Sequence, residues 1–251
     1  MLLAGDIGNT NISFGLFQGA RLLRRFNIPT HDYTLGRLKA SLGKADIADT
    51  LICSVVPKVA QALNHDLSRL LAKRPYNIGK EIEVPIKNLY RHPQQVGQDR
   101  LVNAYAGIRL YGAPLIVVDF GTAVTFDAVS KKGDYLGGMI LPGLEISLEA
   151  LARRTALLPK IKLAKPKEFI GRDTKNSMLS GMVFGFASLT DNLVTRIKDK
   201  IGRNALSIGT GGNIRLIGRY CKRLDKIDPD LTLKGLNLIY QKNRRVGIKK
   251  R

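Results

Sequence analysis

The stretch LLAGDIGNTNISF (2–14) decides the fold, because it places an aspartate and a glycine turn between two apolar segments. This pattern of apolar runs interrupted by Gly and Asn is typical of short antiparallel strands joined by tight turns. A second copy lies half a chain further on, at LIVVDFGTAVTF (115–126), with one residue fewer after the glycine. The repeat predicts two similar α/β domains that face each other across a cleft.

The rest of the chain favours alternating helices and strands. Further strands are expected at 21–28, 50–56, 134–141 and 206–208. Helices are expected at 33–43, after Pro57, after Gly97 and at 214–220. The sequence YGAP (111–114) ends the third of these helices, so we place a domain boundary there. The predicted domains are 1–112 and 113–240, followed by a disordered basic tail at 241–251.

Composition excludes several classes of protein. With 44% apolar and 24% charged residues over 251 positions, the chain is neither disordered, collagen-like nor a coiled coil. It has no apolar run of the roughly 18–20 residues that span a bilayer, and its first residues lack a basic export signal. We therefore expect a soluble cytoplasmic protein without a membrane partner. Cys53 and Cys221 form no CxxC pair and are expected to be reduced thiols.

The charge of the chain raises the possibility of a nucleic-acid partner. It carries 41 basic against 20 acidic residues, a formal charge of +21. The basic residues are spread along the chain, without interleaved aromatics or a recognition-helix signature, so we expect no specific nucleic-acid function. A basic regulatory protein of the same fold stays open as an alternative, and it predicts binding that weakens steeply with salt.

The two repeated turns suit phosphate binding. Glycine allows successive N–H groups to point at a phosphate, a threonine hydroxyl adds a donor, and the preceding aspartate can hold a cation. A plain hairpin with a polar turn is the competing interpretation, and the second copy weakens it. The scattered histidines show no ligand spacing, so any metal site has to use carboxylates.

A third glycine turn follows the strand at LSIGTGGN (206–213). Such a turn allows a nucleotide to approach the backbone closely, although strand-to-helix turns also use glycine without any ligand. The chain contains neither GxGxxG at this place nor a P-loop motif anywhere, so we favour neither a dinucleotide fold nor a P-loop enzyme.

The segment NLYRHPQQVGQDR (88–100) ends at the start of a predicted helix. Asp99 could accept a hydroxyl proton, and Arg100 could hold an anionic substrate or the transferring phosphoryl group. An aspartate near a helix N-terminus is also a common cap, and position alone does not separate the two roles.

An ordered set of motifs resembles the type III pantothenate kinases of the actin, hexokinase and Hsp70-like ATPase superfamily. The resemblance covers about residues 1–240. The motifs are DIGNT (6–10), CSVVP (53–57), NLYRHPQQVGQDR, DFGTAVTFDAV (119–129), YLGGMILPGL (135–144), GRDTKNSMLSG (171–181), TGG (210–212) and LTLKGL (231–236).

The resemblance implies two actin-like (ribonuclease H-like) α/β domains with a nucleotide cleft between them. It implies transfer of the ATP γ-phosphate to the primary hydroxyl of pantothenate, the first step of coenzyme A biosynthesis. The enzyme would be a homodimer that needs Mg and a monovalent cation, potassium or ammonium. Asp99 would be the general base and Asp119 the ligand of the monovalent cation.

The resemblance also implies the binding residues. ATP would contact Asp6, Ile7, Gly8, Asn9, Thr10, Asn11, Ile12, Ser13, Thr122, Gly211 and Gly212. Pantothenate would contact Tyr90, Gly97, Gln98, Asp99, Arg100 and Thr174.

Three positions depart from the usual family pattern. Gln98 replaces a small residue, Val96 replaces Leu, and Asp173 stands where Asn is usual. Gln98 and Asp173 adjoin predicted substrate residues, so they bear on pantothenate affinity. A phosphatase or ATPase of the same superfamily acting on another substrate is a further alternative, against which the intact GQDR segment and Thr174 argue.

Overall fold

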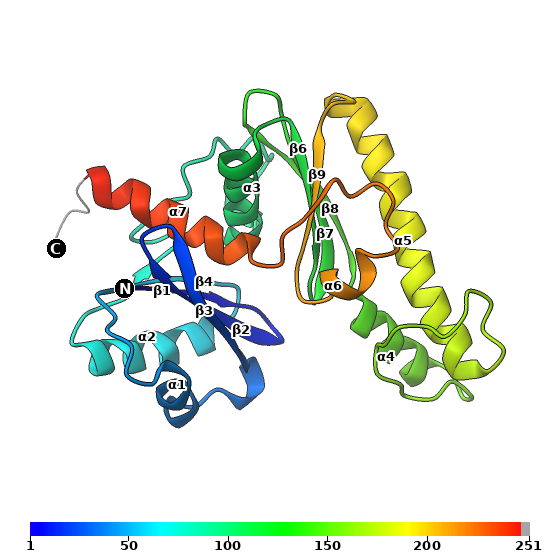
Figure 1. Cartoon of the computed structure of the whole chain (residues 1–251), viewed down its shortest axis with the longest axis horizontal. Helices are drawn as coiled ribbons and strands as arrows, with labels where there is room; N and C mark the ends of the chain where they lie inside the picture. The colour runs from blue at the N-terminus through cyan, green and yellow to red at the C-terminus, as the bar shows by residue number, and fades with distance from the viewer. Residues whose placement is uncertain (247–251) are drawn as a thin grey trace. The chain divides into compact units, whose positions relative to one another are not determined.

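Two five-stranded mixed sheets form the framework of the computed structural model, which describes residues 1–246 (Figure 1). The chain divides into two compact units. The first comprises residues 1–86, 91–110 and the described residues from 231 onward, and the second comprises residues 87–90 and 111–230.

The sheet of the first unit has the strand order β3-β2-β1-β4-β5. Its elements are β1 (Leu2–Ile7), β2 (Asn11–Gln18), β3 (Arg21–Pro29), β4 (Asp49–Ser54), β5 (Tyr76–Asn77), α1 (Leu35–Leu42), α2 (Pro57–Leu71), α3 (Gln98–Tyr111) and α7 (Leu231–Val246). Central strand β1 pairs antiparallel with β2 and parallel with β4. Helices α1 and α2 cover one face of the sheet, and α7 packs against the other (Figure 1).

The sheet of the second unit has the order β10-β9-β6-β7-β8. Its elements are β6 (Leu115–Phe120), β7 (Ala123–Val129), β8 (Tyr135–Pro142), β9 (Leu206–Thr210), β10 (Lys226–Ile227), α4 (Leu144–Arg154), α5 (Thr174–Ile201) and α6 (Ile214–Ile217). Central strand β6 pairs antiparallel with β7 and parallel with β9. Apolar side chains of β6 and β7, among them Val118 and Phe126, pack against α5 residues such as Val183 and Val194.

The internal repeat predicted from the sequence is confirmed. Strands β1, β2 and β4 of the first sheet correspond in position and direction to β6, β7 and β9 of the second. Three residues separate β1 from β2 and two separate β6 from β7, which matches the one-residue difference between the copies. Both central strands consist mostly of buried apolar residues that alternate between the two faces of the sheet.

Two predictions differ from the structure at the C-terminal end. The tail predicted at 241–251 is not disordered from its start, because α7 continues to Val246; residues 247–251 lie outside the described part. By its contacts α7 belongs to the first unit, so the units differ from the predicted ranges 1–112 and 113–240. The buried residues Leu236, Ile239 and Tyr240 of α7 explain this, since they pack on the first sheet.

Smaller features complete the fold. The helix predicted at 214–220 ends at Ile217, where the N–H of Gly218 donates to the carbonyl of Ile214 at 2.8 Å. Cys53 is buried, Cys221 is half-buried, and both are free thiols. Within residues 1–246, no helix is long and apolar enough to span a bilayer.

Candidate active site

Asp6 lies near the end of β1, between two neighbouring strands. Its register partners are Ser13 on β2 and Cys53 on β4. Asp6 is half-buried, whereas the thiol of Cys53 is fully buried. Burial raises the pKa of Cys53 well above its usual value, and the charges of Asp6 and Asp99 add to this effect. Asp6 and Asp99 therefore approach the same buried thiol from two separate segments of the first unit.

The turn after Asp6 is tight and exposes donors to solvent. The N–H of Gly8 donates to the carbonyl of Asn11 at 3.0 Å. Buried Thr30 holds the turn from behind, because its hydroxyl donates to the Gly8 carbonyl at 2.7 Å and its N–H to the Thr10 carbonyl at 2.9 Å. Asn9, Thr10 and Asn11 are exposed, as a turn that receives a phosphate requires.

Asp119 occupies the equivalent place on β6, with Thr125 and Thr210 as its register partners. The turn from β9 packs directly against it. A Cβ atom on Gly211 would lie 2.3 Å from Oδ1 of Asp119, and the φ of Gly211 is +94°. Only glycine satisfies both conditions, so the third glycine turn and the second repeated turn meet at the Asp119 carboxylate.

The turn containing Thr122 is supported from its other side. The N–H of Gly143 donates to the Thr122 carbonyl at 3.1 Å, and a Cβ on Gly143 would lie only 2.2 Å from that oxygen. The N–H of Asn213 donates to the carbonyl of Phe120 at 3.1 Å. Predicted residues Asp119, Thr122 and Gly211 are thus brought together in one cluster of turns.

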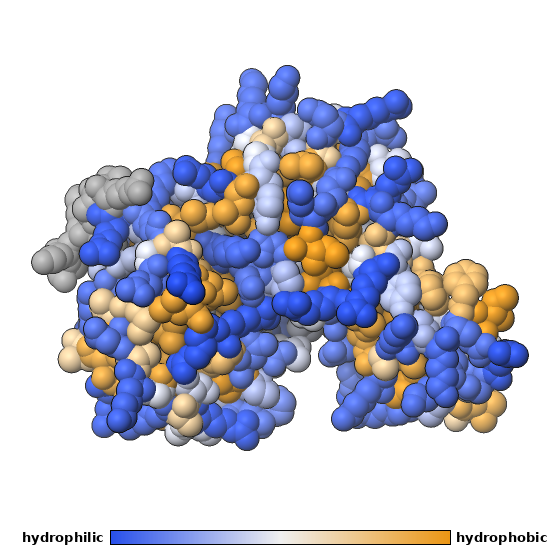
Figure 2. Space-filling model, viewed as in Figure 1, coloured by the Kyte–Doolittle hydropathy of each residue, from blue (hydrophilic) through white to orange (hydrophobic). Residues whose placement is uncertain are grey.

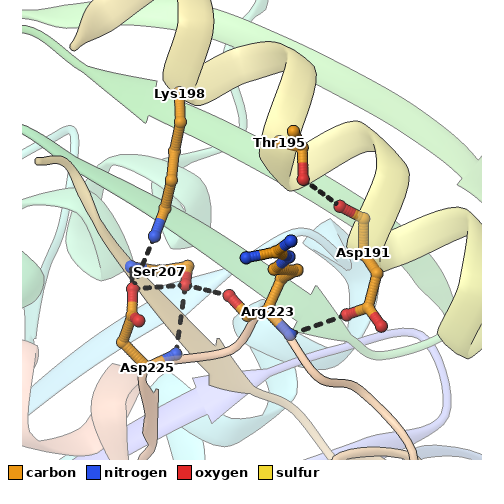
Figure 3. Close-up of polar contacts among 6 residues, drawn as sticks. All are labelled: Asp191, Thr195, Lys198, Ser207, Arg223 and Asp225. Atoms are coloured by element: carbon orange, nitrogen blue, oxygen red, sulfur yellow. Dashed lines mark hydrogen bonds and ion pairs between the residues drawn. The ribbon is translucent and has the colours of Figure 1, made fainter. Parts of the chain in front are cut away.

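A polar network fixes the segment that follows this cluster (Figure 3). Asp225 accepts hydrogen bonds from Nζ of Lys198 at 2.8 Å and from the N–H and hydroxyl of Ser207 at 2.8 and 2.7 Å. Burial acts to raise the pKa of Asp225, but the hydrogen bonds from Lys198 and Ser207 outweigh it and lower the pKa. Asp191 on α5 accepts from the N–H groups of Lys222 and Arg223 at 2.9 and 2.8 Å. Through Asp225, the network connects Ser207 on β9 to Lys198 on α5.

Asp99 lies in the first turn of α3, and its Oδ1 accepts the N–H of Arg100 at 2.9 Å. This contact is of the capping kind. Burial nevertheless raises the pKa of Asp99 above its usual range, although the hydrogen bonds and the positive charge of Arg100 act in the opposite direction. Burial and the hydrogen bonds of the helix start therefore act on the pKa of Asp99 in opposite directions, and burial has the larger effect. Arg100 itself is 8% exposed.

Tyr90 and Thr174 belong to the second unit. Tyr90 lies over β8, because a Cβ on Gly137 would come within 3.2 Å of its ring. Thr174 is the first residue of α5 and is exposed. Asp173 caps this helix by accepting the N–H of Asn176 at 2.8 Å, and this hydrogen bond lowers the pKa of Asp173. Asp173 therefore caps the N-terminus of α5, a role that the asparagine expected at this position could also fill.

The site residues fit cations that oxygen atoms hold. Among residues 1–246, no three or more His, Cys, Asp or Glu side chains are grouped as metal ligands. Mg²⁺ is usually held by one or two carboxylates together with substrate phosphates, so a single aspartate beside a phosphate turn suits it. Oδ1 of Asp119 lies close to both Gly121 and Gly211, so the Asp119 carboxylate is the oxygen ligand that this cluster of turns offers to a cation.

The predicted residues therefore form groups within each unit. The first unit holds Asp6 to Ser13 and Gly97 to Arg100, and the second holds Tyr90, Asp119, Thr122, Thr174, Gly211 and Gly212. Sequence reasoning assigned no role to Thr30 or Gly143, which support the turns, or to Cys53, whose pKa is raised by burial and by the charges of Asp6 and Asp99. Gly143 lies in the motif YLGGMILPGL, and Cys53 lies in CSVVP. The sequence motifs therefore contain both residues, but they do not show what either residue does.

Comparison with known proteins gives matches to one family. The family model described as type III pantothenate kinase matches residues 2–196. A type III pantothenate kinase of Agathobacter rectalis is 40% identical over 99% of this chain and 100% of its own length. Those of Geotalea uraniireducens and Moorella thermoacetica are 41% and 39% identical, each over 97% of this chain and over 99% and 100% of their own lengths.

Solved structures share the fold at low sequence identity. A protein named as a Baf family transcriptional activator from Campylobacter jejuni is 21% identical, with a TM-score of 0.62 over 97% of this chain and 99% of that chain. An activator of 2-hydroxyisocaproyl-CoA dehydratase from Clostridium difficile, with bound ADPNP, is 11% identical, with a TM-score of 0.56 over 100% and 98%. At these identities the likeness concerns the two-domain fold alone.

Proposed function

The chain belongs to the type III pantothenate kinase family, and from this premise we propose that it transfers the γ-phosphate of ATP to the primary hydroxyl of pantothenate, with Asp99 as the general base. The reaction is the first step of coenzyme A biosynthesis. The observation that carries the assignment of the base is the burial of the Asp99 carboxyl group, which raises its pKa.

The proposed step at Asp99 is a proton transfer. The hydroxyl of pantothenate attacks the γ-phosphorus, and the Asp99 carboxylate accepts the hydroxyl proton as the new O–P bond forms. ADP leaves with the electrons of the broken bond. A carboxylate whose pKa is raised by burial is a stronger base than an exposed one. The charge of Arg100 keeps the ionised form accessible.

Two sets of donors serve ATP in this proposal. Within Asp6 to Ser13, the exposed residues Asn9, Thr10 and Asn11 supply amide and hydroxyl groups for the phosphates, and Thr122 adds a second contact. Gly211 and Gly212 allow the nucleoside to approach the backbone near Asp119. Two observations support this interpretation. The turn at Gly8 is tight, and Gly211 stands where a larger residue would collide with Asp119.

Cations complete the proposed nucleotide site. Mg²⁺ would be held by the ATP phosphates and by the carboxylate of Asp6. It would neutralise charge on the γ-phosphoryl group during its transfer. A monovalent cation, potassium or ammonium, would be held by Asp119. The support for this second ion is the position of Asp119 Oδ1 against Gly121 and Gly211.

Pantothenate is a carboxylate with two hydroxyls and an amide, so it needs both charged and polar contacts. We assign these to Tyr90, Gly97, Gln98, Asp99, Arg100 and Thr174. Arg100 would act as an anion-binding group from an almost fully buried position. The cytoplasm is the proposed location, because ATP is abundant there.

A homodimer is the proposed assembly. Edge strand β8 exposes Leu136, Met139 and Ile140, the last to 65%. Phe169 and Ile170, before α5, are 69% and 76% exposed. Figure 2 shows apolar side chains at the surface of this part of the second unit. Exposed apolar surface of this kind marks association sites, and a second copy with twofold symmetry is its simplest occupant.

The test of the proposed function is transfer of labelled γ-phosphate from ATP to pantothenate. We expect a labelled product that requires both substrates. Release of labelled phosphate without a pantothenate product would favour an ATPase or phosphatase. Salt-sensitive nucleic-acid binding without any transfer would favour the regulatory alternative.

A further inference from the structure

The motif LTLKGL (231–236) forms the start of α7 and takes no part in the site described above. Its three leucines are buried. Thr232 and Gly235, which lie between these leucines, contact α3. Both contacts lie within the first unit, and α3 is the helix that carries the proposed base, Asp99.

Thr232 binds a buried polar side chain of α3. Its hydroxyl donates a hydrogen bond to Oδ1 of Asn103 at 2.7 Å, and Asn103 is only 1% exposed. Replacing both partners of a buried hydrogen bond by apolar groups of the same shape costs little stability, so this pair is not needed merely to keep the two helices together. A satisfied buried hydrogen bond does add a single fixed register between the two helices.

Gly235 fixes the same register by close approach. A Cβ on Gly235 would lie 2.8 Å from Cγ1 and from the carbonyl oxygen of Val102, and 3.0 Å from Cβ of Ala106. A backbone oxygen cannot turn away as the end of a flexible side chain can. Residue 235 therefore has to lack a side chain for α7 to lie this close to α3. Because glycine weakens a helix relative to alanine, its presence in α7 indicates that the close packing matters.

The two contacts act one helical turn after the base. Val102 and Asn103 follow Asp99 by three and four residues, which places them on the same side of α3. In an α-helix the N–H of residue 103 donates to the carbonyl of residue 99. The N–H groups of the first turn have no such partners within the helix, so the position of this turn depends on the turn behind it.

We propose that Thr232 and Gly235 are positioning residues, which fix the first turn of α3 and thereby set the place of the Asp99 carboxylate. Neither residue is assigned a contact with a substrate, so a change at either should act on the chemical step more than on binding. The proposal rests on the proposed function, because the place of Asp99 affects the rate only if Asp99 is the base.

The test uses Thr232→Val, which replaces the hydroxyl by a methyl group of similar size. We expect kcat to fall about 5- to 50-fold, less than the loss of about 10²-fold that a full 1 Å misplacement can cause. The KM values for ATP and pantothenate should stay nearly unchanged. Thr232→Ser keeps the hydroxyl and should retain most of the wild-type kcat. Thr190→Val, at a buried threonine of α5 in the second unit, is the matched control and should leave kcat unchanged.

The pH profile of kcat separates positioning from a loss of stability. Burial raises the pKa of Asp99 and the charge of Arg100 lowers it, while Cys53 on β4 responds to the charges of both Asp6 and Asp99. A loosened first turn of α3 would let water reach the Asp99 carboxyl group, so the acid limb of kcat should move to lower pH in Thr232→Val. Thr232→Ser should restore the wild-type limb. A merely structural change would lower the melting temperature and leave this limb in place.

Gly235→Ala is the second variant and should lower kcat at least as much, because the added Cβ has to displace α7 from α3. Gly185→Ala on α5, where an added Cβ meets open space, is its control. The proposal is overturned if Thr232→Val keeps the wild-type kcat and acid limb, if its melting temperature alone falls, or if Thr232→Ser loses as much kcat as Thr232→Val. Failure of the proposed function would look different, since the wild type would then not phosphorylate pantothenate at all.

Discussion

The Asp99 carboxylate lies against the backbone of Gly97, so that a Cβ atom on Gly97 would be 2.5 Å from Oδ1 of Asp99. Any side chain at residue 97 must push the carboxylate away from its present position. Only a glycine at residue 97 leaves room for the carboxylate of the proposed base. This steric requirement explains the glycine of the GQDR motif.

Gly97→Ala should lower kcat strongly, because the added Cβ forces the Asp99 carboxylate to move away from its present position. A displacement of about 1 Å at a catalytic group can cost about 10²-fold in rate. Steady-state kinetics at saturating substrates measures this. Gly36→Ala in helix α1, where an added Cβ meets open space, is the control and should raise stability by about 0.5–1 kcal/mol without affecting kcat. Equal kcat values for both variants would contradict the account.

The pH dependence of activity should reflect the raised pKa of Asp99. Activity needs the carboxylate, so kcat should fall as the pH drops through this pKa, at a pH above the usual aspartate value of about 3.9. The contribution of Asp99 to the stability of the folded protein should depend on pH in the opposite direction, decreasing as the pH rises. Because the folded pKa is raised, Asp99 contributes stability when protonated, and this contribution is lost as the pH rises through the folded pKa.

Thermal melts of the wild type and Asp99→Asn at several pH values separate these effects. At neutral pH the variant should melt higher, because it buries no charge, and the difference should shrink as the pH falls. An acid limb of kcat at the ordinary aspartate pKa, together with a lower melting temperature for Asp99→Asn at pH 7, would show that Asp99 is a cap.

Gly211→Ala should weaken ATP binding by disturbing Asp119. The substitution places a Cβ 2.3 Å from Oδ1 of Asp119 and forces alanine into a φ of +94°. We expect the KM for ATP to rise at least 10-fold and stability to fall by at least 1 kcal/mol. Gly185→Ala on α5, where an added Cβ meets open space, is the control. Unchanged nucleotide binding in Gly211→Ala would remove this turn from the ATP site.

Activity should require potassium or ammonium and be low in sodium alone. The reason is the position of Asp119 against two glycine turns, where its carboxylate can act as a ligand of the ion. Rates in chloride salts of the three cations at equal ionic strength measure the effect. Asp119→Asn should lose the preference among cations. Equal rates of the wild type in sodium and potassium would count against an ion at Asp119.

The sequence was sufficient to predict the repeated part of the fold, because two copies of one pattern reinforce each other. Asp6 and Asp119 indeed occupy equivalent register positions in the two sheets. Helix α5 was not predicted from the sequence. Its buried positions follow helical spacing, but they include Asn176, Ser180 and Thr190, so polar residues interrupt the hydrophobic pattern.

The end of α7 could not be predicted from its own residues. The segment after Tyr240 has no apolar face, yet the helix continues to Val246 beyond the buried residues that anchor it. The residues that support the candidate site could not be predicted from the sequence either. Thr30 holds the Gly8 turn from 22 residues away, and the charges of Asp6 and Asp99 both act on the buried Cys53 thiol, relations that arise only once the chain has folded.

The most direct measurement is the rate of phosphate transfer from ATP to pantothenate by Asp99→Asn, compared with the wild type at saturating substrates. Asparagine keeps the size of the side chain but cannot accept the hydroxyl proton. General-base catalysis contributes about 10²–10⁴-fold, so kcat should fall by this factor while the Kd for ATP stays nearly unchanged. A variant that keeps its kcat and loses only affinity for pantothenate would contradict the assignment of Asp99 as the base.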